Sequence, residues 1–386
     1  MKKTLKTEKV PIKLWLDDIE PGALAQAMNL ANLPFVFHHV AIMPDAHQGF
    51  GMPIGGVMAT AGVVVPNAVG VDIGCGMCAV PTDLSEIAPA DLKKIMAGIR
   101  RLIPLGFNHH KSARDEAWMP VRLGKLPLVE QEFRNALTQV GTLGGGNHFI
   151  EIQRGNDGLI WLMLHSGSRN LGFRVANHYN QLASEINTNK SSPVPKAWQL
   201  AHLDLASTAG RNYLAEMAYC VQFALQNRLL MLEMVKEALI EQLGAMEFGE
   251  VINIAHNYAA LEEHFGREVV IHRKGATSAA KDQLGIIPGS QGSKSYIVRG
   301  LGNPESFRSC SHGAGRLMGR KEAQRTLDLE VEKGRLDQLG VIHALRSHSD
   351  LDEAAGAYKD IGTVIAAQAD LVEVMVELTP LAVIKG

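Results

Sequence analysis

Cysteine, aromatic residues and long apolar runs are all scarce in this 386-residue chain. Four cysteines do not form a disulfide scaffold in a chain of this size, so reduced thiols are expected. No apolar run is long and uninterrupted enough to span a bilayer. The basic start MKKTLKTEKVPIKLW has no apolar segment behind it, unlike a secretory signal peptide. We therefore expect a cytoplasmic protein with no membrane partner.

The chain also lacks an excess of either charge. It has 38 Lys and Arg against 40 Asp and Glu, a net charge of -2. A nucleic-acid partner would therefore need a local cationic groove, because the whole chain is not basic. With 46% hydrophobic and 20% charged residues the composition is that of an ordinary globular protein.

Glycine and histidine are abundant instead, at 38 and 15 residues. Helical spacing with start and stop signals predicts helices over residues 90–103, about 204–243, 320–328 and 351–369. Short β-type runs predict strands over residues 34–43, 55–65, 159–164, 250–255, 268–272, 295–300 and 371–378. No repeat or linker divides the chain, so we interpret residues 1–386 as a single compact α/β domain. Mixed β-sheets would form this domain, with a long helical insertion at about 196–243.

Five stretches share a format, a strand-like run that ends in His, Cys or Asp among small residues. Glycine at such positions allows a sharp turn and close approach of a ligand. Imidazole, thiolate and carboxylate are the usual protein ligands of transition metals. Any one of these histidines alone is more often an ordinary residue, but the five stretches together favour a metal or catalytic centre. We expect the mixed β-sheets to surround it as a central metal cleft. The five stretches are DIGCGM (Asp72, Cys75), GGGNHF (Asn147, His148), MLHSGSR (His165), NIAHNYA (His256) and SCSHGAG (His312).

Cys75 and Cys78 permit three interpretations: a redox pair, half of a structural zinc site, or part of a catalytic metal site. A structural zinc site needs four protein ligands, but Cys220 falls in a predicted helix and Cys310 stands alone. A redox pair should open a helix after a strand, whereas CGMCAVPTDL continues into β-branched residues and proline. A mixed Asp/Cys/His site remains, in which a thiolate can bridge two metal ions. Cys78, Cys220 and Cys310 are then interpreted as plain small residues.

These motifs occur in the order seen in the RtcB family of RNA-splicing ligases, which the chain resembles from about Ile42 to Gly386. PDAHQGFGMPIGGV, HRKGAT, IIPGSQGSKSYIV and the terminal VIKG add to the resemblance. It implies a GTP- and Mn²⁺-dependent enzyme that joins RNA 2′,3′-cyclic phosphate or 3′-phosphate ends to 5′-hydroxyl ends. The reaction would pass through a guanylylated histidine and an RNA 3′-end activated with GMP, in RNA repair or tRNA splicing. An accessory activating protein is left open. The alternative is a metal-dependent phosphoesterase that acts on cyclic phosphate ends without ligation.

The resemblance also implies roles for individual residues. Cys75 would bridge two manganese ions, and His312 would be the histidine that accepts GMP. The other ligands would be His148 and His165 on one ion, and Asp72 and His256 on the other. The implied nucleotide contacts are Asn147, Phe149, Glu151, Asn257, Pro288, Gly289, Ser290, Gly313, Ala314, Gly315 and Lys385.

Basic residues inside the motifs are the expected contacts to RNA phosphates, namely Arg169, Lys274 and Arg316. Asp45 and His47 in PDAHQG either border the same site or have structural roles. Residue chemistry alone does not choose manganese, because thiolate and imidazole bind Zn²⁺ more tightly in the usual affinity order. The chain is compact for the family, and its short segments around 108–126 and 187–197 are expected to shape RNA access.

Overall fold

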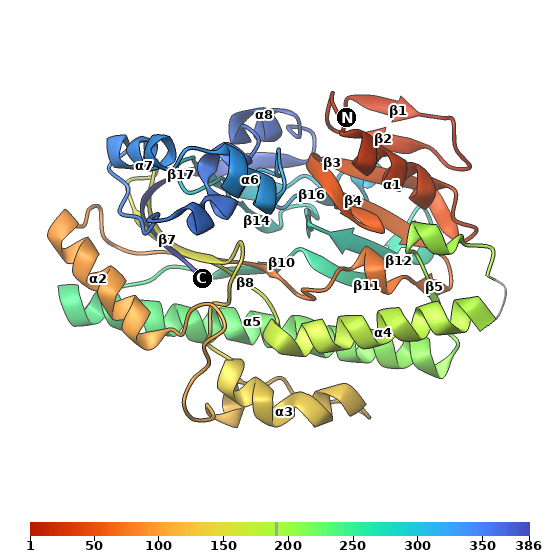
Figure 1. Ribbon diagram of the computed structural model, residues 1–386, viewed down its shortest axis with the longest axis horizontal. Coiled ribbons are helices and arrows are strands. Elements are labelled where there is room, and N and C mark those ends of the chain that lie inside the picture. The colour runs from red at the N-terminus through yellow and green to blue at the C-terminus, as the bar shows by residue number, and fades with distance from the viewer. Residues whose placement is uncertain (190–191) are drawn as a thin grey trace.

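The computed structural model describes residues 1–189 and 192–386, so residues 190–191 of the expected loop 187–197 lie outside it. Two large β-sheets form the upper part of the molecule in Figure 1, and two long helices run beneath them. The fold is the mixed α/β arrangement expected from the sequence. No helix among the described residues is long and apolar enough to cross a membrane.

The first sheet has six strands in the order β1-β2-β3-β4-β12-β11. Strands β2 and β3 are parallel, and every other neighbouring pair is antiparallel. The register of β3 against β4 shifts between Ile42 and His47, which bends the strand where the PDAHQG motif lies. The strands are β1 Lys3–Leu5, β2 Ile12–Leu14, β3 Val36–Phe50, β4 Met52–Thr60, β11 Asn257–His264 and β12 Arg267–Lys274.

The second sheet has seven strands in the order β10-β6-β8-β7-β17-β15-β14, all antiparallel. Two small two-stranded sheets, β13 with β16 and β5 with β9, complete the set. The strands are β6 Gly76–Pro81, β7 Phe149–Gly155, β8 Ile160–Ser166, β10 Ile252–Ala255, β14 Leu284–Ile287, β15 Ser295–Gly300 and β17 Val372–Lys385. The small sheets are formed by β5 Val63–Val64, β9 Leu203–Asp204, β13 Ala276–Ser278 and β16 Ser309–Ser311.

The longest helix, α5, covers Thr208–Leu243, as the sequence predicts. The hydroxyl of Ser207 accepts a hydrogen bond from the Gly210 N–H at its start, and Gly244, with a φ of +89°, ends it. Helices α2, α3, α4 and α5 bury a large apolar cluster against the seven-stranded sheet. The helices are α1 Pro21–Ala31, α2 Pro89–Leu102, α3 Pro127–Gln139, α4 Arg169–Asn189, α5 Thr208–Leu243, α6 Arg320–Thr326, α7 Leu329–Gln338 and α8 Ile361–Ala366.

The helix predicted over 351–369 is wrong. The chain there makes the 3-10 turns His348–Glu353 and Ala355–Ala357 before the short helix α8. Tyr358 is extended because it pairs with Arg316, and Asp360 then caps α8 through the Thr363 N–H. The helices α1, α3, α4 and α7 were not expected. Helix α4 begins at Arg169, the last residue of the HSGSR motif.

Candidate active site

Antiparallel pairing gathers the motif residues at one edge of the seven-stranded sheet. His165 lies near the end of β8, and His256 directly follows β10. Cys75 and His148 instead precede β6 and β7, so the expectation that each motif ends a strand is wrong for these two. Because β6 and β7 both run antiparallel to β8, their beginnings lie beside its end.

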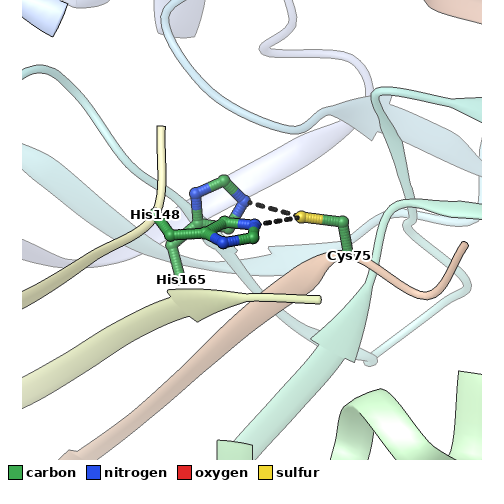
Figure 2. Close-up of side chains that lie close together, drawn as sticks. All are labelled: Cys75, His148 and His165. Atoms are coloured by element: carbon green, nitrogen blue, oxygen red, sulfur yellow. Dashed lines mark hydrogen bonds between the residues drawn. The ribbon is translucent and has the colours of Figure 1, made fainter. Parts of the chain in front are cut away.

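Five side chains converge at this edge. The Cys75 Sγ lies 3.4 Å from the His148 Nε2 and 3.2 Å from the His165 Nε2, and Figure 2 shows both rings pointing at the sulfur. One ligand atom from each of these three residues lies within 4.8 Å of the others. The Asp72 Oδ2 is 3.1 Å from the His148 Nε2, and the His256 Nε2 is 3.3 Å from the His165 Nε2. The five expected metal ligands therefore form one continuous cluster.

The protonation states of the cluster suit metal binding. Burial lowers the pKa of all three imidazoles, which keeps them neutral and able to coordinate. Burial opposes ionisation of Asp72, but the hydrogen bond with His148 lowers its pKa to about 2. Burial and the nearby Asp72 carboxylate raise the pKa of the Cys75 thiol, so a bound cation would be needed to hold the thiolate. The donor set thus fits a metal ion.

Contacts behind the cluster fix its orientation. The Nδ1 of His165 lies 3.0 Å from the Asn147 carbonyl oxygen, which directs the Nε2 toward the sulfur. Arg228 of α5 donates to the carbonyls of Gly74 and Ser166, each at 2.9 Å, next to Cys75 and His165. The long helix therefore positions the two turns that carry these ligands. Arg228 lies in an unremarkable helical stretch, so the sequence offered no signal for this role.

His312 stands directly after β16, beside the cluster. Its ring centroid lies 4.8 Å from that of His256, in an edge-on arrangement. Asp45, from the bent part of β3, places its Oδ2 at 2.6 Å from the His312 Nδ1 and accepts from the His312 N–H at 3.0 Å. A side chain on Gly315 would overlap the Asp45 backbone, so glycine is required for this close approach. Asp45 therefore borders the site, the first of its two expected roles.

A cavity of about 300 Å³ opens over His312 and the cluster. Every residue expected to contact a nucleotide lines this cavity, including the Gly313–Gly315 turn and the Pro288–Ser290 segment. Glu151 is buried at its wall, and burial raises the pKa of this carboxyl to about 8. The Lys385 ammonium lies 5.5 Å from the centroid of the Phe149 ring. The fold thus brings Lys385, near the end of the chain, to the same cavity wall as Phe149 and Glu151.

Several cavity-lining residues had no sequence signal, and Glu353 is central among them. Its carboxylate lies 3.1 Å from the Arg316 Nη1 and 2.7 Å from the Arg320 Nε, and it accepts from the Tyr358 hydroxyl. Residues 351–369 were predicted as a plain helix, which hid this group. The other lining residues without an assigned role are Ile54, Gly275, Gln291, Arg320 and Tyr358. His47, which was expected to border the site or to be structural, also lines the cavity.

The three expected RNA contacts lie at different distances from the cavity. Arg316 lines it. Arg169 lies behind the cluster, with its Nη1 3.3 Å from the His148 Nδ1. Lys274 is buried and donates to the carbonyls of Phe50 and Asn67, at 2.6 and 2.9 Å. These hydrogen bonds give the Lys274 ammonium partners within the protein. A contact between Lys274 and an RNA phosphate stays a prediction.

Comparison with known proteins finds the same family that the order of the sequence motifs indicated. Residues 26–126 and 121–386 match the family model described as tRNA-splicing ligase RtcB. The chain belongs to the RtcB family. The RNA-splicing ligase RtcB of Escherichia coli K12 is 40% identical over 411 residues, which cover 99% of each protein. The tRNA-splicing ligase RtcB of Thermococcus kodakarensis is 31% identical, with 99% of this chain and 96% of the relative covered.

A third RtcB relative extends the similarity to another lineage. The RNA-splicing ligase RtcB of Mycobacterium tuberculosis is 30% identical over 94% of this chain and 100% of its own length. These matches span nearly the whole chain. The similarity to RtcB proteins therefore includes the segments that carry the Cys/His/Asp cluster, His312 and the cavity walls. The resemblance inferred from the motifs is confirmed at the level of the family.

Proposed function

We propose that this RtcB family member is a GTP- and Mn²⁺-dependent RNA ligase. It joins RNA 2′,3′-cyclic phosphate or 3′-phosphate ends to 5′-hydroxyl ends, with His312 as the residue that carries GMP. The single observation behind this proposal is the position of His312, held by a carboxylate on one side and facing a buried Cys/His/Asp cluster on the other. Binding of RNA alone would not need an oriented imidazole next to metal ligands.

The contact with Asp45 assigns the two nitrogens of His312 different tasks. The carboxylate accepts a hydrogen bond from the Nδ1–H of the neutral ring, which leaves Nε2 as the unprotonated nitrogen. An imidazole oriented in this way is a competent nucleophile toward a phosphoryl group, and Asp45 stabilises the positive charge that develops on the ring. Metal ions held by Cys75 and its neighbours would neutralise charge on the phosphoryl oxygens.

The cavity walls suit a guanine nucleotide. The buried Glu151 carboxylate can accept the two N–H groups on the edge of guanine, and such a pairing compensates its burial. Small residues in the Gly313–Gly315 turn leave space for the nucleotide against the backbone. Lys385 and Arg316 supply positive charge near the phosphates.

The proposed ligation consists of three transfer steps, and in each step one bond forms as another breaks. The His312 Nε2 attacks the α-phosphorus of GTP, and pyrophosphate leaves. A terminal oxygen of the RNA 3′-phosphate then attacks the same phosphorus, which moves GMP to the RNA and frees the histidine. The 5′-hydroxyl oxygen finally attacks the RNA 3′-phosphorus, loses its proton and releases GMP. A cyclic phosphate end must first be opened by water to give the 3′-phosphate.

The direct test uses GTP labelled at the α-phosphorus. With Mn²⁺, the label should become attached to the wild-type protein in an acid-labile bond and be absent from His312→Ala. A phosphoesterase without ligase activity would instead open cyclic phosphate ends without GTP, and His312→Ala would keep that activity. Failure of the wild-type protein to take up label would overturn the proposal.

A further inference from the structure

The chain between α2 and α3 makes a tight turn over residues 105–108, at one edge of the candidate site. Gly106 has a φ of +61°, and its N–H donates to the Gly144 carbonyl at 3.1 Å. The Asn108 N–H closes the turn on the carbonyl of Leu105, also at 3.1 Å. The backbone is therefore fixed on both sides of Phe107.

The side chain of Phe107 is 100% exposed. Leu105, in the same turn, packs against the main apolar cluster, so the turn has an inward and an outward side. A phenyl ring left in water forgoes the stabilisation that burial of its apolar area would give. Single exposed apolar side chains are common, so exposure alone does not identify a site. The position of this ring provides the argument.

Gly144 connects the Phe107 turn to the cavity. It lies directly against Gly386, the neighbour of the cavity-lining Lys385. It also packs against the guanidinium of Arg169, which contacts a candidate metal ligand. In Figure 1 the segment that follows α2 passes close to the C-terminus, in agreement with these contacts. The Phe107 turn is thus connected through Gly144 and Gly386 to Lys385 in the cavity wall.

The segment that carries the ring is basic up to Arg114, and the acidic Asp115 and Glu116 follow it. Residues 105–114 contain no acidic residue. The loop between α3 and β7 contains both Gly144 and Gly146. Gly146 lies next to the guanidinium of Arg320 at the start of α6. Exposed basic side chains that flank an exposed aromatic ring are the combination by which proteins hold single-stranded nucleic acid. The exposed basic residues are His109 and Lys111 in the segment of Phe107, and Lys321 and Arg325 in α6, where the exposed Glu322 also lies.

From this juxtaposition we propose that Phe107 stacks on a base of the RNA strand whose end enters the cavity. The basic residues of the Phe107 segment and of α6 hold the phosphates of that strand. This inference rests on the proposed function, because it needs an RNA end at His312. An aromatic face accepts any base, so the contact holds an end without selecting its sequence.

The experiment compares Phe107→Ala and Phe107→Trp with the wild-type protein. The probes are two short single-stranded RNAs, one ending in a 3′-phosphate and one beginning with a 5′-hydroxyl, each with 2-aminopurine near that end. Phe107→Ala should weaken binding of one strand about tenfold and raise its fluorescence in the complex, and Phe107→Trp should restore both. The affected strand identifies which end passes Phe107. Leu261→Ala, which removes an exposed apolar side chain from the edge strand β11 of the six-stranded sheet, should change neither.

Attachment of labelled GMP to His312 needs no RNA, so it should stay at the wild-type level in Phe107→Ala. Wild-type affinity of Phe107→Ala for both strands would overturn the stacking contact. A matching loss of GMP attachment would overturn it as well, because Phe107 would then act on the nucleotide site. Altered self-association with unchanged RNA binding would assign the ring to a protein contact instead. Absence of GMP attachment in the wild-type protein would defeat the proposed function, and RNA affinity would still decide the role of Phe107.

Discussion

The Asp45 Oδ2 lies 2.6 Å from the His312 Nδ1, although the two residues are 267 positions apart in the chain. Asp45 belongs to the six-stranded sheet, and His312 follows a strand of the small β13–β16 sheet. The contact therefore joins separate parts of the fold at His312. It gives a clear expectation for a substitution that keeps the shape of Asp45 and removes its charge.

Asp45→Asn should slow attachment of GMP to His312 by about 100-fold, because an amide can donate to Nδ1 and favour the wrong tautomer. The measurement is the initial rate of label uptake from GTP. Metal content and the thermal midpoint should remain close to wild type, which separates misorientation of His312 from unfolding. An unchanged rate would mean that Asp45 has only a structural role.

Cys75→Ala and Cys78→Ala should differ sharply in metal binding. Cys75→Ala removes the atom that the cluster shares, so affinity for Mn²⁺ should fall at least 100-fold in calorimetric titrations. Cys78 lies in the main apolar cluster, where its truncation should cost about 1 kcal/mol of stability and leave metal affinity intact. Loss of metal in Cys78→Ala would show that the two cysteines act together.

The ion pair between Glu262 and the buried Arg273 should contribute to the free energy of unfolding at neutral pH, and this contribution should be lost in acid. Burial raises the pKa of Glu262, but hydrogen bonds from His264 and Arg273 outweigh this effect and lower it to about 2. A depressed pKa contributes stability that is present above about pH 4.5 and is lost as the pH falls toward 2. The full contribution is on the order of 3 kcal/mol.

Urea unfolding between pH 2.5 and 7 would test this contribution. Glu262→Gln should be less stable than wild type at neutral pH, and the difference should shrink as the pH falls. The matched control is Glu263→Gln, since Glu263 is the exposed neighbour on the same strand. A difference between Glu262→Gln and wild type that stays constant over the whole range would contradict the assignment.

Glu151→Gln should stabilise the ligand-free protein while impairing its activity. The pKa of this buried carboxyl is raised to about 8, so its ionisation disfavours the folded state increasingly from about pH 4.5 to pH 8. The variant should gain about 1 kcal/mol or more relative to wild type at pH 8, and little at pH 5. GMP attachment should fall at the same time, because the amide offers guanine one acceptor in place of a carboxylate. Equal stability at both pH values would count against a buried charge at this position.

The sequence predicted the buried group of Cys75, His148 and His165, which could bind a metal ion, because these residues sit in short motifs of distinctive composition. Asp72, Cys75 and His256 each lie among small residues at a turn, and antiparallel pairing brings such turns together. Residues that support the site from regular elements were not predicted. Arg228 lies in the middle of a helix, and its role depends on the packing of α5 against the strands, which local sequence does not encode.

Glu353 shows a second limit of the sequence. Its segment has helical composition, but Tyr358 pairs with the chain at Arg316, and this tertiary contact overrides the local preference. The cavity wall formed by Glu353, Arg320 and Tyr358 was missed for that reason. Asp45 was identified as a candidate, yet only the bend in β3 shows that it reaches His312.

The division of the site between sheets has a consequence for incompletely folded molecules. The seven-stranded sheet with α5 already contains the frame around Cys75, His148 and His165. The Asp45 carboxylate can contact His312 only when β3 lies against the β13–β16 sheet. Under the proposed function, a chain arrested between these stages would sequester metal but could not consume GTP. Under that function, nucleotide turnover would report completed folding, whereas metal content would not.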